Sequence, residues 1–261
     1  MKYGFLGCGN MGGAIARAVS QITKEIVITD RSGKAKILAQ ELGITYGDAQ
    51  DVADCSVVFL AVKPQMMAQA IEPIKEILQM KKPLLITMAA GLTMQTIEEM
   101  VGVRLPVIRI MPNTPVAVGE GMTLYCYNDL VDGTQHAGFL YAMSKTGRKD
   151  CVAEALIDAA GVVSGCGPAY MYVFAEALAD GAVACGVPRE KALQYAAATL
   201  IGAGKMLLET GLHPGVLKDN VCSPGGSTIA GINVLEQNGF RGILMDCVKA
   251  SFERNKELGK K

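Results

Sequence analysis

A cluster of glycines and hydroxyl residues near the end of the chain has the composition of a binding site for a small anion. It reads Ser223-Pro224-Gly225-Gly226-Ser227-Thr228, and a helix-like apolar segment follows it. Proline suits the first turn of a helix. The glycines leave backbone N–H groups accessible at a helix N-terminus, where a carboxylate is stabilised. The alternative is an ordinary start of a helix that binds no ligand. The motif alone does not decide between the two, and the rest of the chain has to be considered.

A second glycine cluster, close to the start of the chain, has the spacing of a dinucleotide-binding turn. Gly7, Gly9 and Gly12 follow the strand-like segment 3–6 and open an alanine-rich, helix-like segment. The first glycine permits the tight turn, the second lets the backbone approach a pyrophosphate, and the third allows close packing of helix and strand. A second strand-like segment at 25–30 completes the strand–turn–helix–strand context, which counts against a turn that binds nothing.

The residues that end this second predicted strand bear on the choice of cofactor. Asp30 lies 18 residues after Gly12, where a carboxylate accepts a hydrogen bond from the ribose 2′-hydroxyl of NAD(H) and repels a 2′-phosphate. Arg31, Ser32 and Lys34 argue the other way, because they offer a guanidinium, a hydroxyl and an ammonium group to a phosphate. We expect NADP(H) to be preferred, with NAD(H) still open. A solvated loop is the alternative interpretation of the two basic residues.

The composition indicates an enzyme of two parts. The 261 residues are 50% hydrophobic and 19% charged, and 25 basic residues balance 25 acidic ones. This balance gives no strong field to attract nucleic acid or an anionic membrane, so we expect neither as a partner. No run of ~18 apolar residues is present, and the chain enters its first strand without a signal-like segment. We therefore expect a cytoplasmic protein.

The eight cysteines and two histidines do not form a metal-binding or disulfide pattern. No two cysteines stand at C-x-x-C spacing, and all are scattered among apolar or glycine-rich neighbours. We expect most of them to be reduced, buried small hydrophobes, and we expect no metal site.

Strand-like and helix-like segments alternate through residues 1–162. Apolar runs at 56–62, 83–88 and 106–111 are typical of parallel strands covered on both faces, and a helix is predicted over 66–80. The alternation predicts an α/β domain, an N-terminal Rossmann fold with a doubly wound sheet. Ligands bind beyond the carboxyl ends of such strands, so these positions are candidates to line a cofactor cleft: Ala61, Val62, Lys63, Ala89, Ala90, Gly91, Met111, Pro112 and Asn113.

The remaining residues, 163–261, lack strand-like runs. Long segments rich in alanine, leucine and glycine occupy 169–186, 188–210, 227–238 and 240–258. They predict an all-helical C-terminal domain whose small residues let helices approach closely. Its apolar content exceeds what so short a domain buries alone, so we expect a helical interface between subunits, a dimerisation domain. A compact helical domain packed on the first half of its own chain is the alternative.

Together these motifs resemble those of the pyrroline-5-carboxylate reductase family, whose members make proline in the last step of its biosynthesis. The matching segments appear in the family's order and span nearly the whole chain: 4–15, 61–65, 109–115 with 118–121, 164–170, and 219–228. The last two are specific to the family, whereas the first is shared by many dehydrogenases.

The resemblance implies a substrate, a cofactor and an assembly. The substrate would be 1-pyrroline-5-carboxylate, reduced to L-proline with NAD(P)H. Two subunits would interlock as a homodimer, often within a ring of dimers, and each active site would lie between the two domains at the dimer interface. Carried over residue by residue, dinucleotide contacts are expected at Gly7, Cys8, Gly9, Asn10, Met11, Arg31, Ser32, Ala61, Val62, Lys63, Pro64, Ala89, Ala90 and Gly91. The glycine spacing adds Gly12 to the expected cofactor site, and the position beyond a strand end adds Asn113. The substrate carboxylate would be held by Ser223, Gly225, Gly226 and Ser227, with Thr228 as the catalytic residue near the ring nitrogen.

The chemistry of reducing a cyclic imine is compatible with the residues that the resemblance assigns to the substrate. The hydride attacks the C=N carbon, and the substrate motif holds no lysine, histidine or paired carboxylate, so positioning is expected to dominate. The Thr228 hydroxyl can hydrogen-bond the nitrogen as it becomes an amine. A helix hydroxyl bonded back to a backbone carbonyl is the alternative.

Some positions depart from the family pattern, and two rival functions stay open. Gly161, Cys166 and Ser227 stand where the family often has threonine, serine, and alanine or threonine respectively. A related imine or β-hydroxyacid reductase would share the cofactor fold, but should carry a lysine or aspartate acid in its helical half. A dinucleotide sensor without catalytic activity would not need the glycine and hydroxyl cluster near the end of the chain.

Overall fold

The computed structural model describes residues 1–258, which form two compact units. Among these residues, unit 1 comprises Met1–Pro168 and 251–258, and unit 2 comprises Ala169–Ala250. The predicted domain boundary after residue 162 lies inside a continuous helical stretch. No loop marks that boundary, and it stays a prediction.

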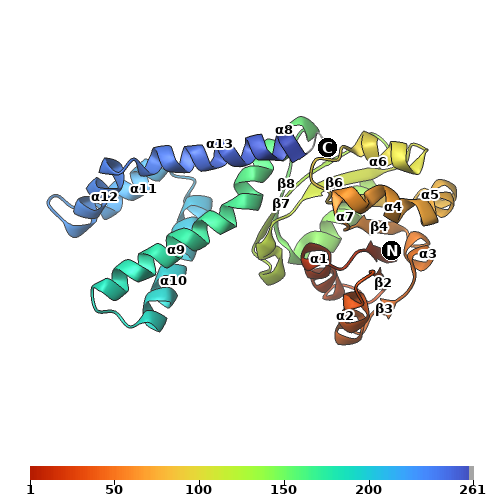
Figure 1. Ribbon diagram of the computed structural model, residues 1–261, viewed down its shortest axis with the longest axis horizontal. Helices are drawn as coiled ribbons and strands as arrows, with labels where there is room; N and C mark the ends of the chain where they lie inside the picture. Colours follow the sequence, from red (N-terminus) through yellow and green to blue (C-terminus); the bar gives the residue numbers. More distant parts are fainter. Residues whose placement is uncertain (259–261) are drawn as a thin grey trace. The chain divides into compact units, whose positions relative to one another are not determined.

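Unit 1 is built on an eight-stranded sheet with helices over both faces (Figure 1). The strand order is β3-β2-β1-β4-β5-β6-β7-β8. The first six strands in this order are parallel, which confirms the predicted doubly wound α/β fold, whereas β7 runs antiparallel to β6 and β8 runs parallel to β7. The bounds are β1 Tyr3–Leu6, β2 Ile26–Thr29, β3 Thr45–Tyr46, β4 Val57–Leu60, β5 Leu84–Thr87, β6 Val107–Met111, β7 Gly121–Tyr127 and β8 Gly147–Cys151.

Side chains alternate across the central strands and so build two apolar layers. Phe5 and Phe59 belong to one cluster, where their rings stack with centroids 4.3 Å apart. Leu6 and Leu60, one residue further along each strand, belong to the cluster on the other face. Because both faces of the sheet are covered, these strands are continuous apolar runs. Polar residues that could bind a ligand are therefore expected at the strand ends.

The helices that cover the sheet differ from the prediction at one place. The single helix predicted over 66–80 is wrong, because Pro73 lacks an N–H donor and its ring clashes with the preceding turn. The segment divides into α4, a 3₁₀ turn at Glu72–Ile74, and α5. The helices of this part of the chain are α1 Asn10–Ser20, α2 Lys34–Leu42, α3 Ala49–Ala53, α4 Met67–Ile71, α5 Lys75–Lys81, α6 Met94–Val101, α7 Gly133–Ala142 and α8 Glu154–Gly161.

Unit 2 consists of helical segments with very little core of its own. Its fully buried side chains are those of Ala179, Ala192 and Ala196, through which α9 and α10 pack together (Figure 1). Many large apolar side chains are exposed instead. The helices that lie wholly in this unit are α10 Arg189–Thr210, α11 Pro214–Val221 and α12 Ser227–Gln237. Two more, α9 Gly167–Ala184 and α13 Phe240–Leu258, lie mostly in it and share their first two and last eight residues with unit 1.

Neither a membrane span nor a metal cluster is found in residues 1–258. None of the helices there is both long and apolar enough to cross a membrane. Nor do three or more His, Cys, Asp or Glu side chains gather there in a way that could hold a metal ion.

Candidate functional site

The turn between β1 and α1 gives its three glycines three different environments. Gly7 has a φ of 104°, and a Cβ there would lie 2.6 Å from the carbonyl oxygen of Ala61. A Cβ on Gly12 would lie 2.4 Å from the carbonyl oxygen of Gly7, so strand and helix touch at this point. A Cβ on Gly9 would meet nothing within 4 Å. The open position is therefore the one where a pyrophosphate would approach the backbone.

The start of α1 adds backbone donors to this open turn. Gly9 caps the helix without a side-chain hydrogen bond, and the first intrahelical bond runs from the N–H of Gly13 to the carbonyl of Gly9 at 2.8 Å. The N–H groups of Asn10, Met11 and Gly12 consequently have no acceptor inside the helix. An open glycine followed by free donors at the positive end of a helix matches the needs of a dinucleotide phosphate.

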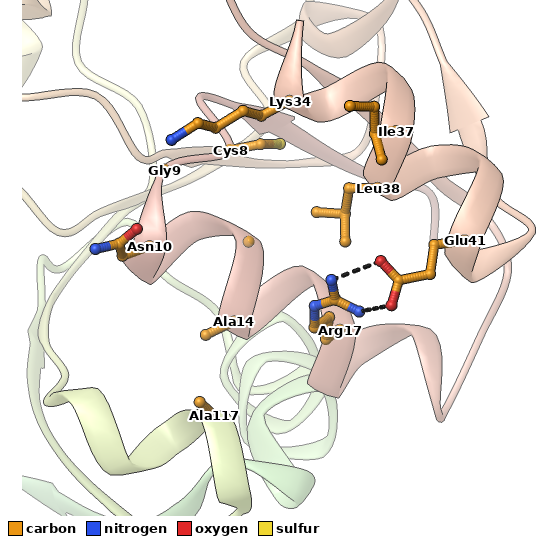
Figure 2. Close-up of a pocket in the computed structure, with 11 residues that line it drawn as sticks. Cys8, Gly9, Asn10, Ala14, Arg17, Lys34, Ile37, Leu38, Glu41 and Ala117 are labelled. Atoms are coloured by element: carbon orange, nitrogen blue, oxygen red, sulfur yellow. Dashed lines mark hydrogen bonds and ion pairs between the residues drawn. The ribbon is translucent and has the colours of Figure 1, made fainter. Parts of the chain in front are cut away.

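A cavity of about 420 Å³ lies beside this turn, between α1 and α2 (Figure 2). Lys34, the first residue of α2, reaches the same cavity as the glycine turn, and the ion pair of Arg17 with Glu41 lies at its far end, with Nη2 and Oε2 2.7 Å apart. The lining residues are Cys8, Gly9, Asn10, Gly13, Ala14, Arg17, Lys34, Ile37, Leu38, Glu41 and Ala117. The structure thus brings Cys8, Gly9 and Asn10 of the predicted set together with a lysine.

The loop after β2 holds the residues expected to distinguish the two nucleotides. The Ser32 hydroxyl donates to Asp30 Oδ2 at 2.7 Å, and Arg31 Nη1 donates to Gln69 Oε1 at 3.1 Å. Asp30 Oδ1 is buried and has no hydrogen-bond partner among the described residues. Arg31, Ser32 and Lys34 are exposed.

Burial keeps the cysteine of the glycine turn protonated. Burial and the negative charge of Asp30 raise the pKa of the Cys8 thiol to about 12. Cys8 therefore contributes packing and backbone to the turn, and no thiolate at neutral pH.

The other predicted cofactor residues gather at the same edge of the sheet because their strands are parallel and in register. Leu6 of β1 pairs with Leu60 of β4, and the Ala61 N–H donates to the Leu6 carbonyl at 2.9 Å. Val62, Lys63 and Pro64 follow, with Lys63 exposed. After β5, Ala89 is buried while Ala90 and Gly91 are exposed, and Gly91 has a φ of 76°.

Asn113, the last of the predicted cofactor residues, is 8% exposed and uses its side chain internally. Its Nδ2 donates to the Ser164 carbonyl at 2.9 Å, and its Oδ1 accepts from the Met122 N–H at 2.9 Å. It therefore ties the end of β6 to a π-helical segment at Val162–Cys166, which the sequence did not indicate. The Ser164 hydroxyl in that segment is buried without a partner among the described residues.

A buried arginine, also missed from the sequence, anchors the helix that leads into this segment. Arg109 of β6 is 2% exposed, and its Nη2 lies 2.5 Å from Asp158 Oδ1 while its Nη1 lies 3.6 Å from Glu154 Oε1. Glu154 also accepts the Met94 N–H at 2.8 Å. Arg109 thus joins the sheet to α8. The unusual glycine at 161 has a local reason, because a Cβ there would lie 2.9 Å from Met111 Cγ.

The glycine and hydroxyl cluster forms a tight turn into α12. The Gly226 N–H donates to the Ser223 carbonyl at 3.0 Å, and Gly225 has a φ of 69° after Pro224, the pattern of a type II turn. A Cβ on Gly226 would lie 2.3 Å from Ser223 Oγ, so only glycine lets that hydroxyl lie against the helix start.

The first turn of α12 has the free donors that an anion needs. Its first intrahelical bond runs from the Ala230 N–H to the Gly226 carbonyl at 3.3 Å, so the N–H groups of Ser227, Thr228 and Ile229 have no acceptor inside the helix. Gly226 caps the helix without a side-chain hydrogen bond, so no side chain of the cap residue occupies these donors. This geometry can hold a carboxylate.

The Thr228 hydroxyl differs from those of threonines inside helices. Thr199 and Thr210 donate to the carbonyls of Tyr195 and Met206, four residues earlier, at 2.7 and 2.6 Å. Thr228 makes no such bond in the part of the chain that the structure describes, because it lies in the first turn of α12, where no helical carbonyl precedes it by four residues. Its side chain is half-buried. Its hydroxyl lies on the same helix turn as the N–H groups that have no acceptor inside the helix.

Family models match both parts of the chain. One described as pyrroline-5-carboxylate reductase dimerisation matches residues 154–258, and one described as NADP oxidoreductase coenzyme F420-dependent matches residues 2–91. Two imine reductases and a ketol-acid reductoisomerase, at 16–17% identity and TM-scores of 0.55–0.64, share the fold alone.

Relatives that match over their full length have higher sequence identity to this chain. The chain is 40% identical to pyrroline-5-carboxylate reductase of Escherichia coli over 99% of this chain and 98% of that protein, and 38% identical to that of Methanosarcina acetivorans over 100% and 98%. A crystal structure of Plasmodium falciparum pyrroline carboxylate reductase with NADP bound has a TM-score of 0.88 at 33% identity, covering 99% of each chain. A solved structure of the Coxiella burnetii pyrroline-5-carboxylate reductase has a TM-score of 0.89 at 33% identity, covering 98% of each chain. The chain therefore belongs to the pyrroline-5-carboxylate reductase family.

Proposed function

We propose that this protein reduces 1-pyrroline-5-carboxylate to L-proline with NADPH as its preferred reductant and NADH as a second one. The observation that carries the proposal is the end-to-end similarity to pyrroline-5-carboxylate reductases at 40% identity. The free N–H groups at the start of α12 and the open glycine turn at the start of α1 supply the two kinds of anion site that this reaction requires.

The dinucleotide would be held by unit 1. The glycine turn and the N–H groups of Asn10 and Met11 would receive its pyrophosphate, and Arg31 with Ser32 would receive the 2′-phosphate. Residues beyond β4 and β5 would line the rest of the cleft: Ala61, Val62, Lys63, Pro64, Ala89, Ala90 and Gly91. Asn113 would act by holding the end of β6 in place, since its amide is already engaged on both sides.

The substrate carboxylate would be held by the turn before α12. The N–H groups of Ser227 and Thr228 point out of the helix start without acceptors, and the Ser223 hydroxyl adds a third donor. Gly225 and Gly226 keep this surface clear of side chains, so that the carboxylate can come close to the backbone.

When bound, the reduced cofactor would supply a hydride to the C=N carbon of the substrate, whose ring nitrogen has taken a proton from solvent, so that hydride and proton together give the amine. The protein's own contribution is to fix the ring by its carboxylate and to direct the Thr228 hydroxyl at the ring nitrogen. That hydroxyl donates a hydrogen bond to the nitrogen as its lone pair develops, which stabilises the transition state more than the ground state. Since the turn offers no strong acid, the rate depends mainly on how well the substrate is oriented.

Unit 2 would also be the surface through which two chains associate. Large apolar side chains on α9 and α10 are exposed, among them Tyr172, Val173, Tyr195, Ile201 and Leu208. The matching family model is described as a dimerisation domain. Covering such a surface with a second copy removes apolar area from water, so a homodimer is expected, with a ring of dimers as the higher assembly. Native mass spectrometry tests both assemblies.

The proposed compartment is the cytoplasm. Cys151 and Cys185 are exposed free thiols, which persist in a reducing environment.

The activity is tested by following oxidation of NADPH and of NADH by the purified protein in the presence of 1-pyrroline-5-carboxylate, with L-proline identified by chiral chromatography. The matched control substrate is 1-pyrroline, which has the same ring and imine without the carboxylate. We expect fast turnover of the first and a kcat/KM at least ~100-fold lower for the second, because the anion site is then empty. Equal turnover of both substrates would favour a general imine reductase, and no turnover of the carboxylate would refute the proposal.

A further inference from the structure

A π-helical segment, Val162–Cys166, lies against the end of β6 and continues α8 without a break. Two contacts fix it there. A Cβ on Gly161, the residue before the segment, would lie 2.9 Å from Met111 Cγ at the end of the strand. Two residues further on, Asn113 Nδ2 donates to the Ser164 carbonyl at 2.9 Å. Short π-helical stretches inside helices occur frequently at functional sites, so this segment is a candidate to present a side chain to a ligand.

The Ser164 hydroxyl is the polar group of this segment that the chain leaves unused. Its Oγ is buried and has no hydrogen-bond partner among the described residues. The residue as a whole is half-buried, and its neighbours Val163 and Gly165 are exposed. Rotation about χ1 therefore moves the hydroxyl between staggered positions while the backbone stays in place. A hydroxyl without a partner indicates a ligand group that completes its hydrogen bonding.

The place of β6 in the sheet indicates which part of a dinucleotide would meet this hydroxyl. The glycine turn after β1 would hold the phosphates, and the loop after β2 would hold the adenosine ribose. In the strand order β3-β2-β1-β4-β5-β6, the end of β6 lies on the opposite side of that turn from β2. It is three strands, or about 14 Å, from β1. The nicotinamide half of the cofactor extends in this direction.

Two other polar side chains near the end of β6 are already engaged. Arg109 is buried in ion pairs with the carboxylates of α8. Asn113 uses both ends of its amide, because it also accepts the Met122 N–H at 2.9 Å. A nicotinamide that arrives here finds these two groups committed and the Ser164 hydroxyl free to bond.

We propose that Ser164 binds the nicotinamide end of the cofactor, its hydroxyl donating a hydrogen bond to the carbonyl oxygen of the carboxamide. The bridge that Asn113 makes from β7 to the Ser164 carbonyl holds the backbone from which this hydroxyl projects. Capture of the carboxamide fixes the rotation of the ring and so orients the hydride donor. The inference rests on the proposed dinucleotide site.

The test measures the binding of three nucleotides to Ser164→Ala and to the unmodified protein by titration calorimetry without substrate. NADP⁺ carries the carboxamide, thionicotinamide-NADP⁺ replaces its oxygen by sulfur, and 2′-phospho-ADP-ribose lacks the nicotinamide altogether. We expect the variant to raise the Kd for NADP⁺ by ~3- to 10-fold, the scale of one hydrogen bond. The Kd for the sulfur analogue should change by less than ~2-fold, because sulfur is a weak acceptor, and that for 2′-phospho-ADP-ribose should stay the same.

Thr123→Val is the matched control. Thr123 of β7 is the other hydroxyl that is buried without a partner among the described residues. Side chains alternate along the strand, which places Thr123 on the face of Tyr125, whereas Leu124 faces Ile157 of α8. The control therefore removes a similar hydroxyl from the face opposite the helix that leads to Ser164. It should leave all three constants within ~2-fold of the unmodified values.

Three outcomes overturn the inference. A Kd for NADP⁺ that Ser164→Ala changes by less than ~2-fold would show that the hydroxyl makes no bond to the cofactor. Equal losses for NADP⁺ and 2′-phospho-ADP-ribose would make Ser164 a structural residue. Equal losses for NADP⁺ and its sulfur analogue would exclude the carbonyl oxygen as the acceptor. If the unmodified protein bound none of the three nucleotides, the proposed dinucleotide site itself would be refuted.

Discussion

Replacement of Gly226 by alanine adds one carbon atom, the Cβ, to the proposed carboxylate site before α12 and so tests that site. The new Cβ would lie 2.3 Å from Ser223 Oγ, whereas ordinary contact between these atoms begins at about 3.4 Å. The hydroxyl therefore has to move by roughly 1 Å or turn away. The backbone itself is not strained, because Gly226 has φ and ψ of −74° and 167°, which every L residue adopts. The change acts mainly on the Ser223 hydroxyl, and the Ser223 carbonyl, which the Cβ would meet at 3.2 Å, has to shift by only a few tenths of an ångström.

The size of the effect follows from the bond that is lost. A hydrogen bond from a hydroxyl to a carboxylate contributes about 1.5–3 kcal/mol, which corresponds to roughly 10- to 100-fold in kcat/KM. Since the carboxylate is bound in both the ground state and the transition state, most of the loss should appear as a higher KM for 1-pyrroline-5-carboxylate. The Kd for NADPH should not change, because the glycine turn at α1 is untouched.

Gly231→Ala is the matched control for this prediction. It makes the same change inside the same helix, at a position where a Cβ would meet nothing within 4 Å. It should leave the kinetics unaltered and stabilise the helix by up to about 1 kcal/mol. Steady-state kinetics of both variants with NADPH decide the matter. A KM within ~2-fold of the unmodified value in Gly226→Ala would show that the carboxylate is held somewhere else.

Three further predictions concern residues whose roles differ. Thr228→Ala should lower kcat by roughly 10- to 100-fold with little change in the Kd for NADPH, and Thr228→Ser should recover most of the rate; an unchanged kcat in folded Thr228→Ala would reduce Thr228 to a helix residue. Arg31→Ala should raise the KM for NADPH by ~10-fold or more and leave that for NADH nearly unchanged, whereas equal effects would mean that Arg31 does not read the phosphate. Arg109→Met should lower the free energy of unfolding, measured in urea, by about 1–3 kcal/mol, because it leaves two half-buried carboxylates without their ion-pair partner. The control Arg104→Met removes an exposed ion pair and should lower it by about 0–1 kcal/mol. Equal losses in the two variants would contradict the anchoring role of Arg109.

The sequence indicated those parts of the structure whose cause is local. The spacing of Gly7 and Gly12 indicated a tight turn and a close packing, and at both positions the structure leaves no room for a side chain. The structure leaves Gly9 open, and its contact with a pyrophosphate stays a prediction. The continuous apolar runs of β4 and β5 marked strands buried on both faces, and the small-residue segments marked the helices of unit 2.

Other features depend on contacts between distant residues and gave no local signal. Arg109 sits within an apolar strand, and only the carboxylates of α8, some 50 residues later, explain its burial. The antiparallel β7 pairs with β6 across a short connection that holds only a 3₁₀ helix, Thr114–Val118, and no α-helix, which the alternation of strand and helix did not predict. The break at Pro73 was the exception, since proline alone was sufficient reason to divide that helix.

The central claim is that one protein holds the dinucleotide and the substrate together, so that hydride passes directly from one to the other. This claim is tested most directly by following the hydrogen that leaves the nicotinamide. The purified protein would be supplied with 1-pyrroline-5-carboxylate and NADPH carrying deuterium at the transferable position of its nicotinamide, and the product analysed by mass spectrometry. We predict L-proline that carries one deuterium at the ring carbon formerly double-bonded to nitrogen. Unlabelled proline, or no proline while both ligands bind, would contradict the assignment.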